Sequence, residues 1–473
     1  MCKSKGIGHF FKQNRGFRGL YPQSKSPAYL CPFPQDHPYM RYQPLDSSVF
    51  VANRARYTAS LGSGSMAVFV ASDQVPANGD AYHPYRPDSN LYWLSGIDQE
   101  LTALLLFPDC PNPAYREVLF VRETSPELAV WEGPRHSREE ASALSGISQV
   151  LWEKDFETVL WTQAKYASDI HLALNENDRA SASPVRSASQ RLAGRLTNDF
   201  PLHRFHRASP ALDRLRAVKS QEEVQTLQKA ISITHNALLQ ALKVIRPGCM
   251  EYQVEAALAG SILGQGAEGF SFEPIIASGD HACILHYTRN AAPCKDGDLL
   301  LMDFGASYAH YAADLTRCIP VNGRFTPRQK EVYDAVLDVQ RQAMDLLRPG
   351  RSLNDYNQES ALIMQDAVLR LGLISSEDVA KQDPKSPAYK RYFPHGTGHF
   401  LGLDVHDVGA RYESLQEGMV ITCEPGLYIP EEGLGIRIEN DVVVSAAGPV
   451  DLMKDLPIRT DEIEEAYHSA QRN

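Results

Sequence analysis

Short apolar runs separated by amphipathic stretches predict that the first half of the chain folds as an α/β unit. The runs expected to form strands lie at residues 67–71, 91–94, 102–107 and 117–121. The stretches expected to form helices lie at residues 53–61, 137–144 and 156–166. Residues 180–210 are rich in Ser, Arg and Ala, which predicts a helix and a connector.

The second half repeats one helical plan twice. Ser220-Gln-Glu-Glu223 has the sequence of a capping box, and Thr326-Pro327 combines an N-cap residue with proline at the first helical position. Each signal opens a long amphipathic helix that ends at an Arg-Pro-Gly tripeptide. A second helical stretch follows each tripeptide, at residues 254–263 and 359–371.

A predicted strand hairpin with two acids follows each helix pair. The first hairpin pairs residues 298–304 with 308–319 around a turn at 305–307, and the second pairs 419–424 with 434–444 around 425–433. The recurring order of helix, stop, helix and acidic hairpin predicts duplicated halves about a pseudo-twofold axis. We therefore expect an N-terminal domain over residues 47–175, a connector over 176–211 and a duplicated domain over 212–460.

Composition places the chain among globular proteins. It has 473 residues, of which 43% are hydrophobic and 22% charged, and this length suits two or three domains. A net charge of −11 argues against a nucleic-acid partner or an anionic membrane surface. The sequence has no apolar run long enough to span a bilayer, so we expect no membrane partner.

The cysteines and the chain ends bear on location. The eight cysteines include no Cys-x-x-Cys pair, which favours free thiols in a reducing cytoplasm. Residues 1–46 are basic and predict a disordered tail, or an upstream extension of a start at Met40; an organelle transit peptide is the alternative. Residues 461–473 are expected to form a C-terminal tail.

Five polar residues lie in segments that we expect to pair as strands: Asp303, Asp314, His399, Glu424 and Glu439. Buried carboxylates are costly unless they are paired or bound to a metal, and four of them together would repel one another. Oxygen-rich ligation with one imidazole suits Mn²⁺, Co²⁺, Fe²⁺ or Zn²⁺. Two such ions about 3.5–4 Å apart, bridged by carboxylates and a water, would form a hydrolytic centre.

At these residues the sequence resembles the pita-bread metallopeptidases, and among them most closely the proline-specific aminopeptidases (aminopeptidase P). The resemblance runs from about Asn53 to Ala447. The matching segments are Tyr85–Gly96, Ile284–Tyr287, Asp303–Gly305, Tyr311–Arg317, His395–His399, Val405–Gly409, Glu424–Tyr428 and Arg437–Glu439. The resemblance implies an N-terminal mixed-sheet α/β domain and a C-terminal pita-bread domain whose duplicated helix–hairpin halves surround the metal site.

The resemblance also implies a role for each candidate residue. Asp303 would bind one metal, His399 and Glu424 the other, and Asp314 and Glu439 would bridge them. Glu424 would also be the catalytic base, with His286 and His406 stabilising the tetrahedral intermediate. His395, Tyr428 and Arg437 are the substrate-binding candidates: they would line the pocket for the prolyl ring or hold the metal ligands in place. The cofactor would be two divalent ions, Mn²⁺ first, with Co²⁺, Zn²⁺ or Fe²⁺ as alternatives.

The implied reaction is hydrolysis of the N-terminal Xaa-Pro bond of peptides with proline in second position, by a hydroxide that bridges the metals. A dipeptide-specific prolidase is the alternative, although only fourteen residues separate Glu424 from Glu439, which favours the aminopeptidase. A metal-free creatinase-like or protein-binding relative is more remote. Relatives imply a homo-oligomer, dimer or tetramer, in which Trp93 or a neighbour would reach the site of a partner subunit.

Overall fold

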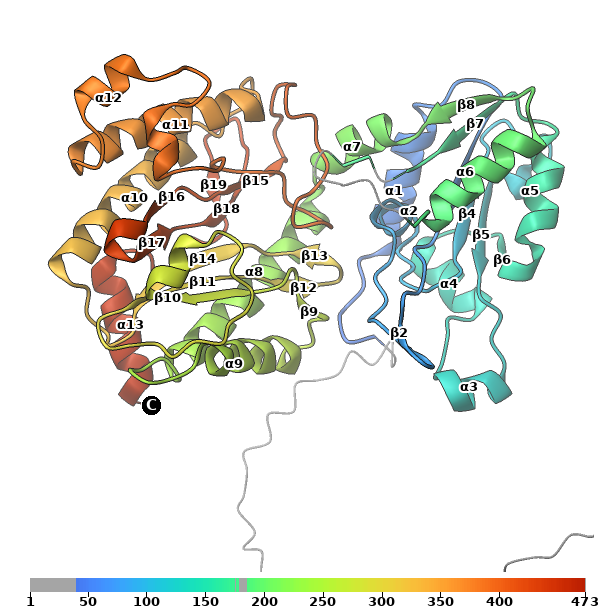
Figure 1. The fold of residues 1–473 in the computed structure, drawn as a ribbon. Helices are drawn as coiled ribbons and strands as arrows, with labels where there is room; N and C mark the ends of the chain where they lie inside the picture. Colours follow the sequence, from blue (N-terminus) through green and yellow to red (C-terminus); the bar gives the residue numbers. More distant parts are fainter. Residues whose placement is uncertain (1–39, 175, 178–184, 473) are drawn as a thin grey trace, which may run out of the picture. The chain divides into compact units, whose positions relative to one another are not determined.

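A computed structural model describes residues 40–174, 176–177 and 185–472 (Figure 1). Most of the predicted basic tail lies outside these residues. Of its described part, Tyr42 and Leu45 are buried. At the other end, the predicted C-terminal tail is wrong, because α13 (Thr460–Arg472) is a helix with Ile463 and Tyr467 buried.

The N-terminal part contains a six-stranded sheet in the order β6-β5-β4-β1-β7-β8. Its strands are β1 Ser65–Val70, β4 Ala103–Leu106, β5 Glu117–Val121, β6 Val150–Trp152, β7 Asp169–Leu172 and β8 Arg204–Arg207. β4 is antiparallel to β1 and β5, and the other neighbours are parallel. The mixed sheet predicted for this part of the chain is confirmed.

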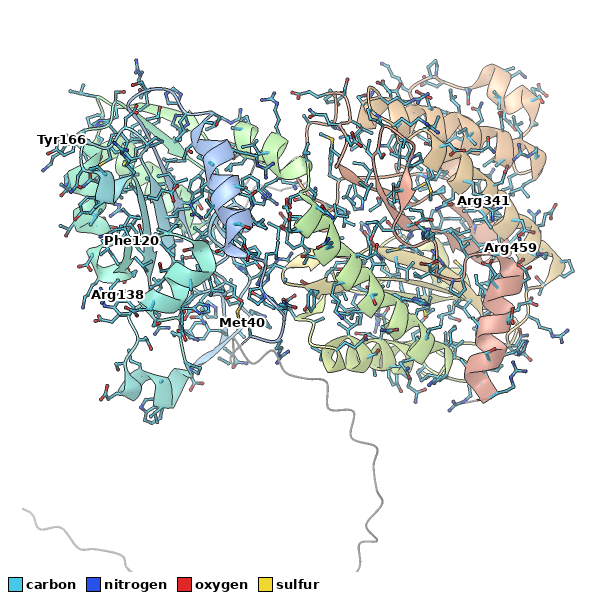
Figure 2. The ribbon with its side chains drawn as sticks, turned by 180° about the vertical axis from the view of Figure 1, so that it is seen from behind. Met40, Phe120, Arg138, Tyr166, Arg341 and Arg459 are labelled. Carbon is cyan, nitrogen blue, oxygen red and sulfur yellow. The ribbon has the colours of Figure 1, made fainter. Side chains whose placement is uncertain are left out.

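Alternation along β1 divides the apolar side chains between the two faces of this sheet. Ala67 and Phe69 belong to one core cluster, and Met66 and Val68 belong to the other. The first cluster is completed by α1 Ser47–Thr58, α2 Ser89–Ser95 and α4 Arg138–Ser145. The second is completed by α5 Phe156–Ala164 and α6 Ala188–Asp199, and it includes Phe120, labelled in Figure 2.

Two local predictions for this part are corrected. Residues 91–94 form helix α2 rather than a strand, because Asp88 caps the amides of Asn90 and Leu91 and Gly96 ends the helix in the left-handed conformation. The stretch expected as a helix and a connector contains the predicted helix, α6, but it also supplies a strand, β8, which pairs with β7. Trp93 is 1% exposed and donates to Glu223 Oε1 (3.1 Å), so it cannot contact a partner subunit.

The C-terminal part contains the predicted duplicated helices. α8 (Gln221–Leu242) and α9 (Glu251–Gly264) lead the first half, and α10 (Pro327–Asp345) and α11 (Leu353–Arg370) lead the second. α8 and α10 both begin with capping boxes. α11 begins six residues earlier than the pattern predicts, because Ser352 and Asp355 form another capping box.

The acidic hairpins are more divided than predicted. In the first half β11 (Leu299–Phe304) pairs with β10 (Ile275–Ser278) and β14 (Leu315–Pro320), while β12 (Ala306–Tyr308) joins β9 (Gly269–Phe270) and β13 (Tyr311–Ala312). In the second half β15 (Val420–Cys423) pairs with β18 (Asn440–Val443), which also pairs with β19 (Val450–Asp451). β16 (Gly426–Ile429) pairs separately with β17 (Leu434–Arg437). Each predicted hairpin is therefore a pair of strands with a second pair between them.

The halves are connected by hydrogen bonds between the ends of these strands. Glu439 N donates to Thr316 O (3.2 Å), and Arg317 Nη1 donates to Glu439 O (2.8 Å). Asp314 N donates to the carboxylate of Asp441 (3.1 Å). The candidate metal ligands thus lie where the two halves meet. No helix in the described part of the chain has the length and apolarity that crossing a membrane requires.

Candidate active site

The segments that carry the candidate ligands pair as expected, but four of the five ligands lie at the ends of strands or beside isolated bridges. Asp303 alone is within a strand, β11. Asp314 precedes β14 by one residue, Glu424 follows β15, and Glu439 precedes β18. His399 lies in a loop whose next residue forms an isolated bridge with Ile421. The ends of the strands position these side chains, and the backbone hydrogen bonds within each strand pair remain intact.

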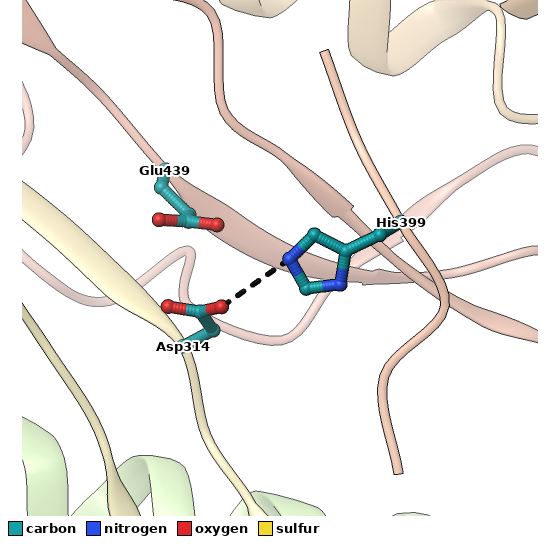
Figure 3. A group of neighbouring side chains, drawn as sticks. All are labelled: Asp314, His399 and Glu439. Carbon is teal, nitrogen blue, oxygen red and sulfur yellow. Dashed lines mark ion pairs between the residues drawn. The ribbon is translucent and has the colours of Figure 1, made fainter. Parts of the chain in front are cut away.

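Asp314, His399 and Glu439 form a compact group in which one donor atom from each lies within 4.8 Å of the others (Figure 3). All three are buried. His399 Nε2 is 3.5 Å from Asp314 Oδ2 and 3.8 Å from Glu424 Oε1. These distances place two carboxylates and one imidazole around a common space.

The backbone fixes which nitrogen of His399 faces that space. Nδ1 lies 2.9 Å from Phe400 O. Because a carbonyl oxygen can only accept a hydrogen bond, Nδ1 must carry the proton, and Nε2 of the neutral ring has the free lone pair. A histidine that donates one N–H to a carbonyl presents the other nitrogen to a metal. His399 is therefore oriented as a ligand.

Arg437 connects several candidate residues. Its Nη2 forms an ion pair with Asp303, its Nη1 donates to the Tyr428 hydroxyl (2.8 Å), and its Nε donates to Thr316 Oγ1 (3.3 Å). Thr316 in turn donates to Glu439 Oε2 (2.7 Å). The Arg437 guanidinium thus holds one carboxylate directly and positions another through Thr316.

A second chain of hydrogen bonds runs from Arg437 to His395. The Tyr428 hydroxyl accepts from Arg437 and lies 2.8 Å from His395 Nε2, while His395 Nδ1 lies 2.7 Å from Gly396 O. Nδ1 must therefore carry the proton, and Tyr428 donates to Nε2. This chain sets the tautomer of His395.

The buried charges of the site favour a bound cation. Burial, with repulsion from Asp314, Glu424 and Asp303, raises the pKa of Glu439 well above its usual range. Burial also raises the pKa of Glu424 to about 7, despite the opposing charges of His399 and Arg437. Buried oxygens at Asp303 Oδ1 and Glu439 Oε1 accept no hydrogen bond from the described residues. Orphaned carboxylate oxygens beside an oriented imidazole fit a hard or borderline divalent ion.

The five candidate ligands all line a cavity of about 390 Å³. His286, His395, His406 and Arg437 line it too, so the structure brings together every candidate except Tyr428. Tyr428 is buried and contacts Arg437 and His395, both of which line the cavity. The His406 ring meets the His399 ring edge to face, with centroids 4.3 Å apart.

Sequence reasoning missed two polar groups and the apolar residues of the cavity. Thr316 and Asp441 are buried beside the ligands, and each follows a candidate ligand by two residues. Period-two alternation along a strand could have identified both. Phe272, Leu285 and Val405 also line the cavity, and no sequence signal separates them from core residues.

Comparisons with known proteins define the class. The chain matches metallopeptidase family M24 over residues 225–446 and the aminopeptidase P N-terminal domain over residues 50–171. It belongs to this metallopeptidase family, as the resemblance in sequence predicted. Divalent metal ions are the cofactors that the family implies.

The individual proteins that resemble this chain have names that specify the peptidase more closely than the family name does. The Xaa-Pro aminopeptidases of Haemophilus influenzae and Escherichia coli are 32% and 33% identical to this chain. Both alignments cover 89% of this chain, and they cover 97% of the first relative and 98% of the second. The structure of aminopeptidase PepP from Pseudomonas aeruginosa superposes with a TM-score of 0.82 at 32% identity, covering 91% of this chain and 100% of its own. The predicted α/β fold class is thereby confirmed.

Proposed function

We propose that this protein is a metallo-aminopeptidase that hydrolyses the peptide bond between an N-terminal residue and a following proline. The observation that carries the proposal is the convergence of four carboxylates and an oriented imidazole around one cavity. The relatives named Xaa-Pro aminopeptidase, aligned over nearly their whole length, supply the substrate class.

The same convergence suggests how two divalent ions would be held. Asp314 and Glu439, which lie between the halves, would bridge the ions. His399 and Glu424 would complete one ion's ligands, and Asp303 would bind the other in competition with Arg437. When bound, two such ions supply Lewis acidity for the scissile carbonyl and lower the pKa of the attacking water. Mn²⁺ is our first choice among Mn²⁺, Co²⁺, Zn²⁺ and Fe²⁺, since oxygen ligands predominate.

Other side chains around the cavity would transfer the proton, stabilise the tetrahedral intermediate and bind the substrate. Glu424 is the most exposed of the four carboxylates, with 18% of its side chain accessible, so it can accept a proton from water and return it. His406 and His286 can donate to the oxygen of the tetrahedral intermediate. His395 faces the cavity with its tautomer set by Tyr428, and the apolar residues of the cavity can hold the prolyl ring.

A prolidase is the second candidate, because it would need the same metal ligands. Hydrolysis of an Xaa-Pro dipeptide and of longer Xaa-Pro-Yaa peptides, in added Mn²⁺, separates the two. We expect the longer peptides to be cut at the Xaa–Pro bond. Cleavage confined to the dipeptide would establish the prolidase, and no cleavage of either, with no bound metal, would refute the enzyme.

Self-association and location complete the proposal. We propose a cytoplasmic homo-oligomer without nucleic-acid or membrane partners. Its contact surface would include α3 (Pro126–Glu132), labelled in Figure 1, where Val130 and Trp131 are 81% and 88% exposed. Exposed large apolar side chains side by side indicate an interaction surface. Light scattering of Trp131→Ser tests it: an unchanged mass would remove α3 from the interface.

A further inference from the structure

The first Arg-Pro-Gly tripeptide makes a turn that places two cysteines opposite each other. Cys249 N donates to Arg246 O (3.0 Å), and Gly248 between them has a φ of +86°. Cys294 N then donates to Cys249 O, and Gly248 N donates to Cys294 O, both at 2.8 Å. This is a turn followed by a glycine bulge, and it leaves Cys249 and Cys294 as cross-strand neighbours.

The second tripeptide repeats this turn without cysteines. Gly350 has a φ of +96° and donates to Leu415 O (3.1 Å), while Leu415 N donates to Arg351 O (2.6 Å). An isolated bridge follows in each half, Met250 with Pro293 and Ser352 with Ser414. Arg351 and Leu415 thus occupy the positions of Cys249 and Cys294. The same turn forms in the second half without cysteines, so the turn does not need the cysteine pair, which is found only in the first half of this duplication.

The two cysteines lie opposite each other where the segments that carry them pair. A hydrogen bond between the thiols lowers the pKa of Cys249 and raises that of Cys294, so Cys249 is the more acidic of the two. Cys249 is 3% exposed and Cys294 is not exposed, so a small oxidant reaches the thiolate first. Directly opposed residues in an antiparallel pair have Cα atoms about 5.5 Å apart, which is typical of disulfides.

We propose that Cys249 and Cys294 form a reversible disulfide when the protein meets a hydroperoxide. The Cys249 thiolate attacks the terminal peroxide oxygen, the O–O bond breaks, and a sulfenic acid forms as an alkoxide leaves, which is hydroxide when the oxidant is hydrogen peroxide. The Cys294 thiol then attacks that sulfur, the S–O bond breaks, and water leaves as the S–S bond forms. The protein loses two electrons, the peroxide gains them, and a dithiol reductant reverses the reaction.

The disulfide would restrain residues 278–292, a segment that contributes to the candidate active site. Glu251, two residues after Cys249, is fully buried and accepts hydrogen bonds from Ser278 N (2.9 Å), the Tyr287 hydroxyl (2.9 Å) and Ala292 N (2.7 Å). His286, which lines the cavity, lies within this segment. A disulfide to Cys294 would add a covalent tie at the end of the segment that Glu251 already holds.

Mass spectrometry of the full-length protein tests the bond. After hydrogen peroxide treatment and alkylation of free thiols, we expect a tryptic peptide ending at Arg289 to be joined to the peptide that carries Cys294, with a mass about 2 Da below the sum of the two. The longer peptide also contains Cys283. The decisive experiment therefore uses Cys283→Ser as the background, in which the joined peptide should persist.

Two further variants make the result specific. Cys249→Ser and Cys294→Ser should each abolish the joined peptide. Oxidation should also raise the melting temperature of the Cys283→Ser protein by about 5 °C, reversed by dithiothreitol and absent from the two other variants. The proposal is overturned if no joined peptide forms in folded protein, if Cys283→Ser removes it, or if it appears only after denaturation.

Discussion

Thr316→Val should weaken metal binding without removing a single candidate ligand. The hydroxyl of Thr316 donates to Glu439 Oε2 (2.7 Å) and accepts from Arg437 Nε (3.3 Å). Valine keeps the shape and the strand preference of threonine, so β14 should be retained. What disappears is the donor that orients the Glu439 carboxylate.

The size of the effect follows from the burial of Glu439. That residue is 1% exposed, and its Oε1 already has no hydrogen bond among the described residues, so water cannot replace the lost donor. A hydrogen bond to a charged group contributes about 1.5–3 kcal/mol. Loss of that amount corresponds to a fall in metal affinity of about 10- to 100-fold, the range seen when partners of metal ligands are removed.

Isothermal titration of the metal-free protein with Mn²⁺ measures this change, and Thr397→Val is its control. Thr397 is fully buried between His395 and His399 in sequence, but its hydroxyl has no hydrogen-bond partner in the part of the chain that is described. The control should bind Mn²⁺ as the unsubstituted protein does. Equal affinity in Thr316→Val, or an equal loss in Thr397→Val, would refute the reasoning.

Three other substitutions probe the site and its surroundings. Asp314→Asn should abolish turnover while leaving the melting temperature of the metal-free protein within a few degrees; half-retained activity would contradict a bridging role. His406→Ala should lower kcat by about 10²–10³-fold with metal content unchanged, and a rise in KM alone would show that His406 only binds substrate. Asp213→Asn removes a carboxyl whose pKa burial raises to about 6, so its contribution to stability is present below the unfolded pKa and is lost as pH rises through 6. Between about pH 4 and 8 this variant should gain about 1 kcal/mol over the unsubstituted protein in urea unfolding, after allowance for solvent screening; a gain independent of pH would contradict the assignment.

Helices were the most predictable part of this chain from its sequence. Ser220 and Thr326 mark the starts of α8 and α10 because caps and Pro at the first turn are local signals. Residues 91–94 resemble a strand in sequence because four consecutive apolar or aromatic residues show neither helical nor strand periodicity. The cap at Asp88 and the stop at Gly96 decide the conformation there.

The site was predictable as a set of residues but not as a geometry. Acids that follow apolar runs, such as Asp303 and Glu424, stand out because burial of a carboxylate needs a reason. Which strand end each acid occupies in space depends on pairing between segments far apart in sequence, such as Thr316 with Glu439. The role of Arg437 was open for the same reason: only the fold shows that it contacts Asp303 and Thr316. The ligand roles themselves stay predictions.

The hydrogen bond from Glu439 N to Thr316 O has a consequence for the order of folding. Neither half carries the whole ligand set, since Asp303 and Asp314 come from one and His399, Glu424 and Glu439 from the other. Contacts this distant in sequence form late, after each half has gained its local helices. The capacity to capture a divalent ion should therefore appear last during refolding. A metal-sensitive signal would then time the docking of the two halves.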